Sequence, residues 1–125
     1  MWYIGYFYSE VVPDHVVGMA YAYMDTDARE LLLGFSYQST YKPYARRVMA
    51  MQISQYDDDT IRAEGTHDIT MSVTGHCEMD RMSLSYTTTG IADNGHVGLF
   101  RTNNIQTQQM IRRRLVLDES EIIMI

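Results

Sequence analysis

The stretch ITMSVTGHCEMDRMSLSYTT, residues 69–88, contains the pattern that decides the fold. Apolar residues alternate with threonine and serine from Ile69 to Val73, and they alternate with serine from Met82 to Tyr86. Successive side chains of a β-strand point to opposite faces, so this period of two predicts two strands that each bury one face. A tight turn near Met79-Asp80 would join the two strands as an antiparallel hairpin.

The same alternation recurs on both sides of this hairpin, in short segments separated by turn residues. Asp93-Asn94-Gly95 is expected to be a type I′ hairpin turn, because asparagine and glycine tolerate the positive φ angles it needs. Residues Ile105–Met110 are interpreted as either a short helix or a loop. The expected strands are Trp2–Ser9, Val17–Tyr23, Glu30–Gln38, Arg46–Tyr56, Thr60–Gly65, Ile69–Met79, Arg81–Thr88 and His96–Thr102, followed by terminal strands at Arg114–Leu117 and Glu121–Ile125.

Short strands with turns about every 8–12 residues are typical of an antiparallel meander, sandwich or barrel. Closure of the sheet removes exposed strand edges, which would otherwise promote aggregation. We therefore expect an all-β fold, a small antiparallel up-and-down β-barrel of roughly eight to ten strands. The chain of 125 residues has the length of one domain, so residues 1–125 are predicted to form it.

The formal net charge of −6 disfavours a protein that coats long nucleic acids, because such a chain repels polyanions. Cys77 is the single cysteine, which excludes an internal disulfide and fits a reducing, cytoplasmic compartment. No apolar run reaches the length of about 18 residues that a membrane-spanning helix requires. A strand that starts directly at Trp2 leads us to expect a domain excised from a longer protein.

The sequence contains no recognisable catalytic motif. His76-Cys77-Glu78 matches the H-x-E part of the zinc-deaminase signature, but the accompanying P-C-x-x-C is absent. No G-x-S-x-G elbow occurs, and the acidic runs Asp57-Asp58-Asp59 and Asp118-Glu119 are typical of solvated turns. We expect no metal site, no cofactor and no enzymatic activity, and we interpret the chain as a binding protein.

Two arginine clusters, Arg46-Arg47 and Arg112-Arg113-Arg114, stand apart from the acidic runs. Arginine presents a planar fork of donors that suits phosphate groups. Tyr37, Tyr41 and Tyr44 are near the first cluster in sequence, and tyrosine rings can stack on nucleobases. The alternative is that all of these residues are ordinary surface residues of strands.

Several segments resemble the soluble β-barrel of a family of bacterial anti-phage effectors that belong to CBASS defence systems. The resemblance implies two transmembrane helices before the barrel, a cyclic dinucleotide ligand made by a nucleotidyltransferase, homo-oligomerisation and disruption of the inner membrane from its cytoplasmic side. A tryptophan that the family pattern would have after the arginine of the fourth strand is replaced by Arg47-Val48. The segments that carry the resemblance are Trp2-Tyr3-Ile4-Gly5-Tyr6, Gly34-Phe35-Ser36-Tyr37, Pro43, Arg46-Arg47, Ile61, Ile69–Tyr86 and Gly95–Arg101.

The resemblance does not place ligand contacts residue by residue. The leading hypothesis is a cyclic-dinucleotide-sensing effector domain without catalytic residues, because two phosphates suit arginine and two bases suit aromatic rings. The alternatives are a lipocalin-like or fatty-acid-binding-like carrier of a hydrophobic ligand, and an enzyme of allene-oxide-cyclase type. The candidate ligand-binding residues are Tyr37, Tyr41, Tyr44, Arg46, Arg47, Tyr86 and Arg101.

Overall fold

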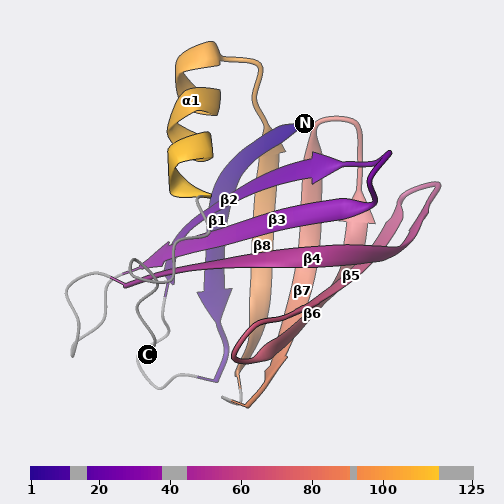
Figure 1. Cartoon of the computed structure of the whole chain (residues 1–125), viewed down its shortest axis with the longest axis vertical. Helices are drawn as coiled ribbons and strands as arrows, with labels where there is room; N and C mark the ends of the chain where they lie inside the picture. The colour runs from indigo at the N-terminus through magenta and orange to yellow at the C-terminus, as the bar shows by residue number, and fades with distance from the viewer. Residues whose placement is uncertain (12–16, 38–44, 91–92, 116–125) are drawn as a thin grey trace.

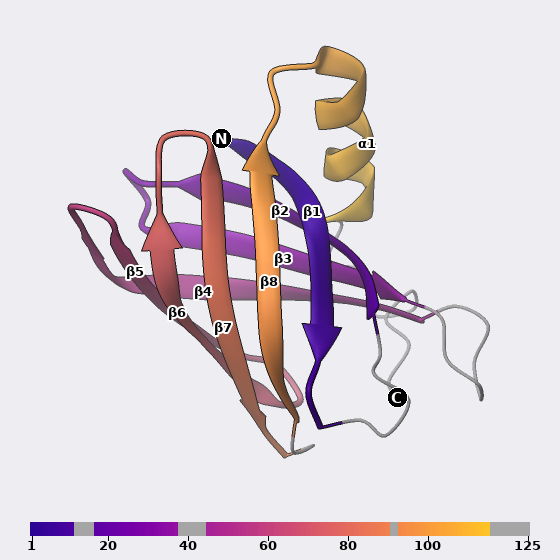
Figure 2. The ribbon, with the colours of Figure 1, turned by 180° about the vertical axis from the view of Figure 1, so that it is seen from behind.

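Eight antiparallel strands pair in chain order, and the first strand pairs with the last to close the barrel (Figures 1 and 2). This architecture comes from a computed structural model that describes residues 1–11, 17–37, 45–90 and 93–115. It confirms the predicted all-β antiparallel barrel, and of the two alternatives for Ile105–Met110 it shows the helix, which extends to Arg114. The strands are β1 (Trp2–Ser9), β2 (Val17–Asp25), β3 (Glu30–Tyr37), β4 (Ala45–Asp57), β5 (Thr60–Thr66), β6 (Thr70–Cys77), β7 (Arg81–Thr89) and β8 (Asp93–Arg101), and the helix is α1 (Ile105–Arg114).

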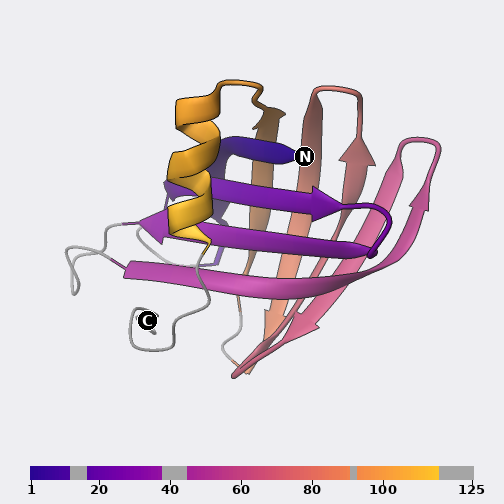
Figure 3. The ribbon, with the colours of Figure 1, turned by 45° about the horizontal axis from the view of Figure 1, so that its top comes forward.

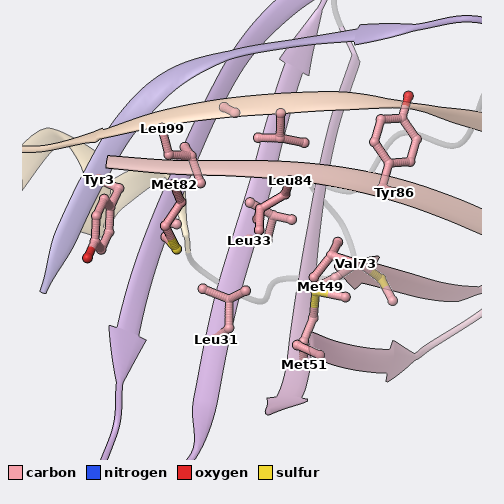
Figure 4. Packing of buried hydrophobic residues seen from close by; sticks show 14 of the residues in the cluster. Tyr3, Leu31, Leu33, Met49, Met51, Val73, Met82, Leu84, Tyr86 and Leu99 are labelled. Carbon is pink, nitrogen blue, oxygen red and sulfur yellow. The ribbon is translucent and has the colours of Figure 1, made fainter. Parts of the chain in front are cut away.

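The inner face of the barrel is filled by the apolar members of the alternating pattern. Leu31, Leu33, Met49, Met51 and Leu99 are all at most 1% exposed, so no space large enough for water touches them. Figure 4 shows these side chains meeting between the strands, with Tyr3 and Tyr86 at opposite ends of the cluster. The middle of the barrel is therefore a packed core, as is usual for a barrel of about eight strands.

The prediction of a turn at Asp93-Asn94-Gly95 is wrong, because all three residues belong to β8 and pair with β7. The chain reverses earlier, between Thr89 and Asp93, and Gly90 there has a φ of +98°. The Asp93 carboxylate accepts hydrogen bonds from side chains of β1 and β7, which holds it in the sheet. A Cβ on Gly95 would lie 2.0 Å from the backbone oxygen of Tyr8, so this glycine permits close strand approach.

The predicted terminal strand at Arg114–Leu117 is also wrong at its start, since Arg114 ends α1 and Leu115 caps it. The remainder of that segment and the predicted strand Glu121–Ile125 lie outside the described residues. The Asn104 side chain accepts a hydrogen bond of 2.9 Å from the backbone N–H of Thr107, which is a typical N-cap. Three arginines in the last turn interact favourably with the negative end of the helix dipole, so the helix is stabilised at both ends.

Helix α1 packs on the outside of the barrel and builds a second, smaller core. Its buried residues Ile111 and Leu115 contact a cluster that includes Tyr21 and Val48, on β2 and β4 (Figure 3). With ten residues, α1 is too short to cross a bilayer, and no helix in the described part of the chain could do so.

The two ends of the barrel differ in charge. One end, here called the acidic end, is formed by three hairpin turns that carry clustered carboxylates. The other, here called the Arg47 end, is where β1, β3, β5 and β7 finish. The carboxylates of the acidic end are Asp25, Asp27, Glu30, Asp57, Asp58, Asp59, Glu78 and Asp80.

Replacement of Ile111 by alanine should lower the free energy of unfolding by about 2–5 kcal/mol, because it leaves a cavity under α1. Ile105 on the same helix is 69% exposed, against 0% for Ile111, and serves as the matched control. The Ile105→Ala variant should change stability by less than about 0.5 kcal/mol. Urea unfolding followed by circular dichroism measures both variants, and equal losses would contradict the packing of α1 described above.

Candidate ligand-binding site at the Arg47 end of the barrel

Arg47 is a charged residue on the otherwise apolar inner face of β4. It pairs across the ladder with Phe35, whereas its neighbour Arg46 pairs with Ser36. Because side chains alternate along a strand, Arg47 faces the barrel interior and Arg46 faces outward. The Arg47 side chain is only 9% exposed, so its guanidinium is largely removed from water at the rim of the core.

An acidic partner in the turn between β5 and β6 neutralises Arg47. Its Nη1 donates to Oδ1 of Asp68 at 2.7 Å and its Nη2 approaches Oδ2 at 3.5 Å, a two-pronged arrangement. This hydrogen bond from Arg47 outweighs partial burial and lowers the pKa of Asp68 below its ordinary value. The pair fixes the position of the guanidinium fork at this end of the barrel.

A second polar group is formed by residues of β1, β7 and β8, which are neighbours in the barrel wall. The Tyr86 hydroxyl donates to Oδ2 of Asp93 at 3.2 Å, and the Ser9 hydroxyl donates to Oδ1 of the same carboxylate. Burial, followed by the nearby Asp93 charge, raises the pKa of Tyr86 far above its ordinary value. Tyr86 is therefore a neutral hydrogen-bond donor across the physiological pH range.

Aromatic rings connect the two polar groups. Phe7 lies 4.8 Å from Phe35 and 5.8 Å from Tyr37 between ring centroids, and Phe35 lies 5.9 Å from Tyr86. Burial raises the pKa of Tyr37 to about 12; Arg47 lowers this pKa and Asp93 raises it. The arrangement is a lining of four rings with one arginine and two carboxylates around it.

Of the seven residues predicted from the sequence, Tyr37, Arg47 and Tyr86 come together at this end. Arg46 lies on the outer wall, and Arg101 lies at the acidic end, where its backbone N–H donates to the Asp80 carbonyl at 2.7 Å. Tyr41 and Tyr44 are outside the described residues. The structure thus separates the Arg46-Arg47 pair that the sequence presents as one cluster.

Sequence reasoning missed Ser9, Asp68 and Asp93. Asp93 was assigned to a turn, and Asp68 to a polar segment between strands, so neither was considered as a partner of an inner-face residue. One signal was available: Arg47 is in phase with Met49 and Met51, both of which are buried inside the barrel. A charged residue at a strand position that faces the core requires a partner of opposite charge. An acidic residue is therefore expected close to Arg47 in the folded chain.

Arg47 gives this end a group that can bind an anion, because a guanidinium fork suits a phosphate as well as a carboxylate. The four rings named above are core residues that are only 3–7% exposed, so in this structure they pack against one another. In the described part of the chain, no group of three histidine, cysteine or acidic side chains could hold a metal ion. No protein-family model matches the sequence, and no curated protein matches it either.

The Asp68→Asn variant should be less stable than the wild type by about 1–3 kcal/mol at pH 7, because Arg47 loses its charged partner. The folded-state pKa of Asp68 is lowered, so this stabilisation is present above the ordinary pKa of 3.8. It is lost as the pH falls through the lower folded-state pKa, and the two proteins should converge in stability there.

Urea unfolding at a series of pH values measures this convergence. Glu64→Gln is the control, since Glu64 is an exposed carboxylate whose side chain accepts a hydrogen bond from Ser72 at 3.1 Å. It should change stability by less than about 0.5 kcal/mol at every pH. A stability difference for Asp68→Asn that does not vary with pH would show that the charge pair is not its cause.

Proposed function

We propose that this barrel is a receptor domain that binds a cyclic dinucleotide at its Arg47 end. The observation that carries the proposal is the placement of Arg47 on the inner face, close to Tyr37 and at the same end of the barrel as Tyr86. A cyclic dinucleotide has two phosphates and two bases, so it offers partners for both the guanidinium and the rings. The sequence resemblance to CBASS effectors supports the same ligand class.

Binding would replace one anionic partner of Arg47 by another. Asp68 is held by the guanidinium in the same two-pronged geometry that a phosphate adopts, so the fork is already oriented for an incoming anion. The displaced carboxylate lies in a turn and its side chain is 32% exposed, which allows it to be solvated after exchange. Ligand affinity should therefore depend on the guanidinium shape as well as on its charge.

The charge distribution favours the Arg47 end over the acidic end for an anionic ligand. Three turns at the acidic end carry clustered carboxylates, and Arg101 lies next to one of them. A dianionic ligand approaching there meets stronger repulsion than at the Arg47 end, where the described carboxylates are only Glu10, Asp68 and Asp93 and Asp68 is already paired with Arg47. This distribution supports Arg47 and argues against Arg101 as the phosphate contact.

The resemblance extends the proposal to the cellular role. The domain would oligomerise once the cyclic dinucleotide is bound and would act at the cytoplasmic face of the bacterial inner membrane, through helices that this sequence does not contain. No reaction is assigned to it. The alternative, a carrier of a hydrophobic ligand, is less well supported, because the described centre of the barrel is occupied by its own leucines and methionines.

Isothermal titration calorimetry on the 125-residue chain tests the proposal with cyclic di-GMP, cyclic di-AMP and cyclic UMP-AMP as ligands. At least one should bind, and the Arg47→Gln variant should weaken it roughly tenfold or more, since a charge-assisted hydrogen bond is worth about 1.5–3 kcal/mol. Arg47→Lys keeps the charge, removes the fork and should also weaken binding. The matched controls Arg46→Gln and Arg101→Gln should leave the affinity within about twofold.

Circular dichroism and thermal unfolding establish that each variant is folded before it is titrated. Failure of all three cyclic dinucleotides to bind the folded wild type would refute the proposal. A loss of binding in Arg101→Gln but not in Arg47→Gln would move the site to the acidic end. Saturable binding of oleate in place of the nucleotides would support the carrier.

A further inference from the structure

A shallow groove runs along the outer wall of the barrel, next to the part of β1 that α1 contacts. β1, β8, β7 and β6 lie next to one another there (Figure 2). Across these strands the register places Tyr6, Gly98, Ser83 and His76 in one row, all with outward-facing positions. A large side chain at each edge and two small residues between them create the hollow.

The next outward-facing row consists of Tyr8, His96, Ser85 and Thr74, with its two large side chains next to each other on β1 and β8. Two adjoining cavities of about 500 and 520 Å³ follow the rows, and both are lined by Tyr6, His76, Ser83 and Gly98. Each volume falls within the range of about 300–1,000 Å³ that is typical of small-molecule sites. Together they form one elongated groove.

Aromatic rings with free faces border the groove. Tyr6 and Phe100 are each 50% exposed, although both lie on strands in the middle of a wall. A Cβ on Gly98 would lie 2.7 Å from Cζ of Tyr6, which shows that the tyrosine ring lies across the glycine, inside the groove. The neighbouring Tyr8 ring packs against His96 with 5.1 Å between centroids.

Hydrogen-bonding groups line the remainder of the groove at fixed positions. His96 is held between Glu10, at 2.8 Å from its Nε2, and the Ser85 hydroxyl, at 3.4 Å from its Nδ1. Hydroxyl groups and imidazole nitrogens both donate and accept hydrogen bonds, so they match ligands that carry many hydroxyls.

The charge of the groove restricts the class of ligand. Asp59, Glu78 and Arg81 line one end only, and Glu78 already pairs with Arg81 at 3.2 Å. Along the rest of the groove the lining side chains are aromatic, hydroxyl or imidazole groups. The net charge of these lining residues is negative, so it repels the phosphates of a nucleic acid. Without that charge, the exposed rings would also suit a nucleic acid.

We propose that this groove is a binding site for a neutral oligosaccharide. One face of a sugar ring carries C–H groups that pack on an aromatic ring, and its hydroxyls require partners that both donate and accept. Tyr6 and Phe100 supply the rings, and Ser83, Ser85 and His76 supply the polar partners. The groove is on the outer wall, so this site is independent of the Arg47 end.

Nuclear magnetic resonance titration of the 125-residue chain with cellohexaose, chitohexaose, maltohexaose and mannohexaose tests this proposal. At least one sugar should shift the backbone amide signals of Gly98, Ser83 and His76 and leave those at the Arg47 end unchanged. Tyr6→Ala should weaken that binding roughly tenfold, the effect of losing about 1.4 kcal/mol of contact with the ring. The control Met19→Ala removes a side chain that is 46% exposed on the adjacent strand, and should leave the affinity unchanged.

The Gly98→Ala variant is a second test of the groove, and it keeps the Tyr6 ring. The three atoms nearest to the added Cβ all belong to the far end of the Tyr6 side chain, so the ring must move while the strands stay in place. This variant should unfold at the same temperature as the wild type and lose the sugar. Absence of saturable shifts with all four sugars, or shifts by an oligonucleotide in their place, would overturn the proposal.

Discussion

The two-residue period of the strands, imposed on a closed cylinder, is the constraint on which the whole structure depends. Closure pairs every strand on both sides, so every second residue must enter an interior of limited volume. Leucine, methionine and alanine fill that volume along β2, β3 and β4, and the middle of the barrel is packed. Any polar side chain that points into the barrel must then lie near one end of it, where a hydrogen-bonding or charged partner is within reach.

Arg47 is a polar side chain of this kind, and its position near one end of the barrel defines the candidate site. The same alternation that places Met49 and Met51 in the core brings Arg47 to the rim, where Asp68 compensates its charge. Removal of Asp68 leaves the guanidinium of Arg47 with little access to water, so the pair stabilises one arrangement of the β5–β6 turn. The aromatic rings beneath it belong to the core itself, so the residues of the proposed site also stabilise the fold.

The outward-facing side chains follow the same two-residue period, but part of the outer wall is covered and part is accessible. Helix α1 covers the outward side chains of β2 and β4 near their middle, whereas those of β8, β7 and β6 remain accessible beside Tyr6. Small outward residues on β8 and β7 leave a groove instead of a flat surface. The two proposed ligand sites therefore lie on opposite faces of the wall, one inside the barrel end and one outside.

The eight strands could be predicted from the sequence because alternation is a local property, and each segment carries its own pattern. The same reasoning failed at Asp93-Asn94-Gly95, where the local preference for a turn was overridden by hydrogen bonds from Ser9 and Tyr86. It also failed at Arg114, since the burial of Ile111 that stabilises this helix depends on the outer wall of the barrel.

The sequence by itself determined the strand period, the inner and outer phases and the presence of arginine among tyrosines. Only the tertiary structure decided that Arg101 lies at the opposite end of the barrel from Arg47, and that Asp68 and Asp93 join the site. The physical reason is that these relations depend on register and closure. Both are set by contacts between strands that are far apart in the chain, which no local pattern records.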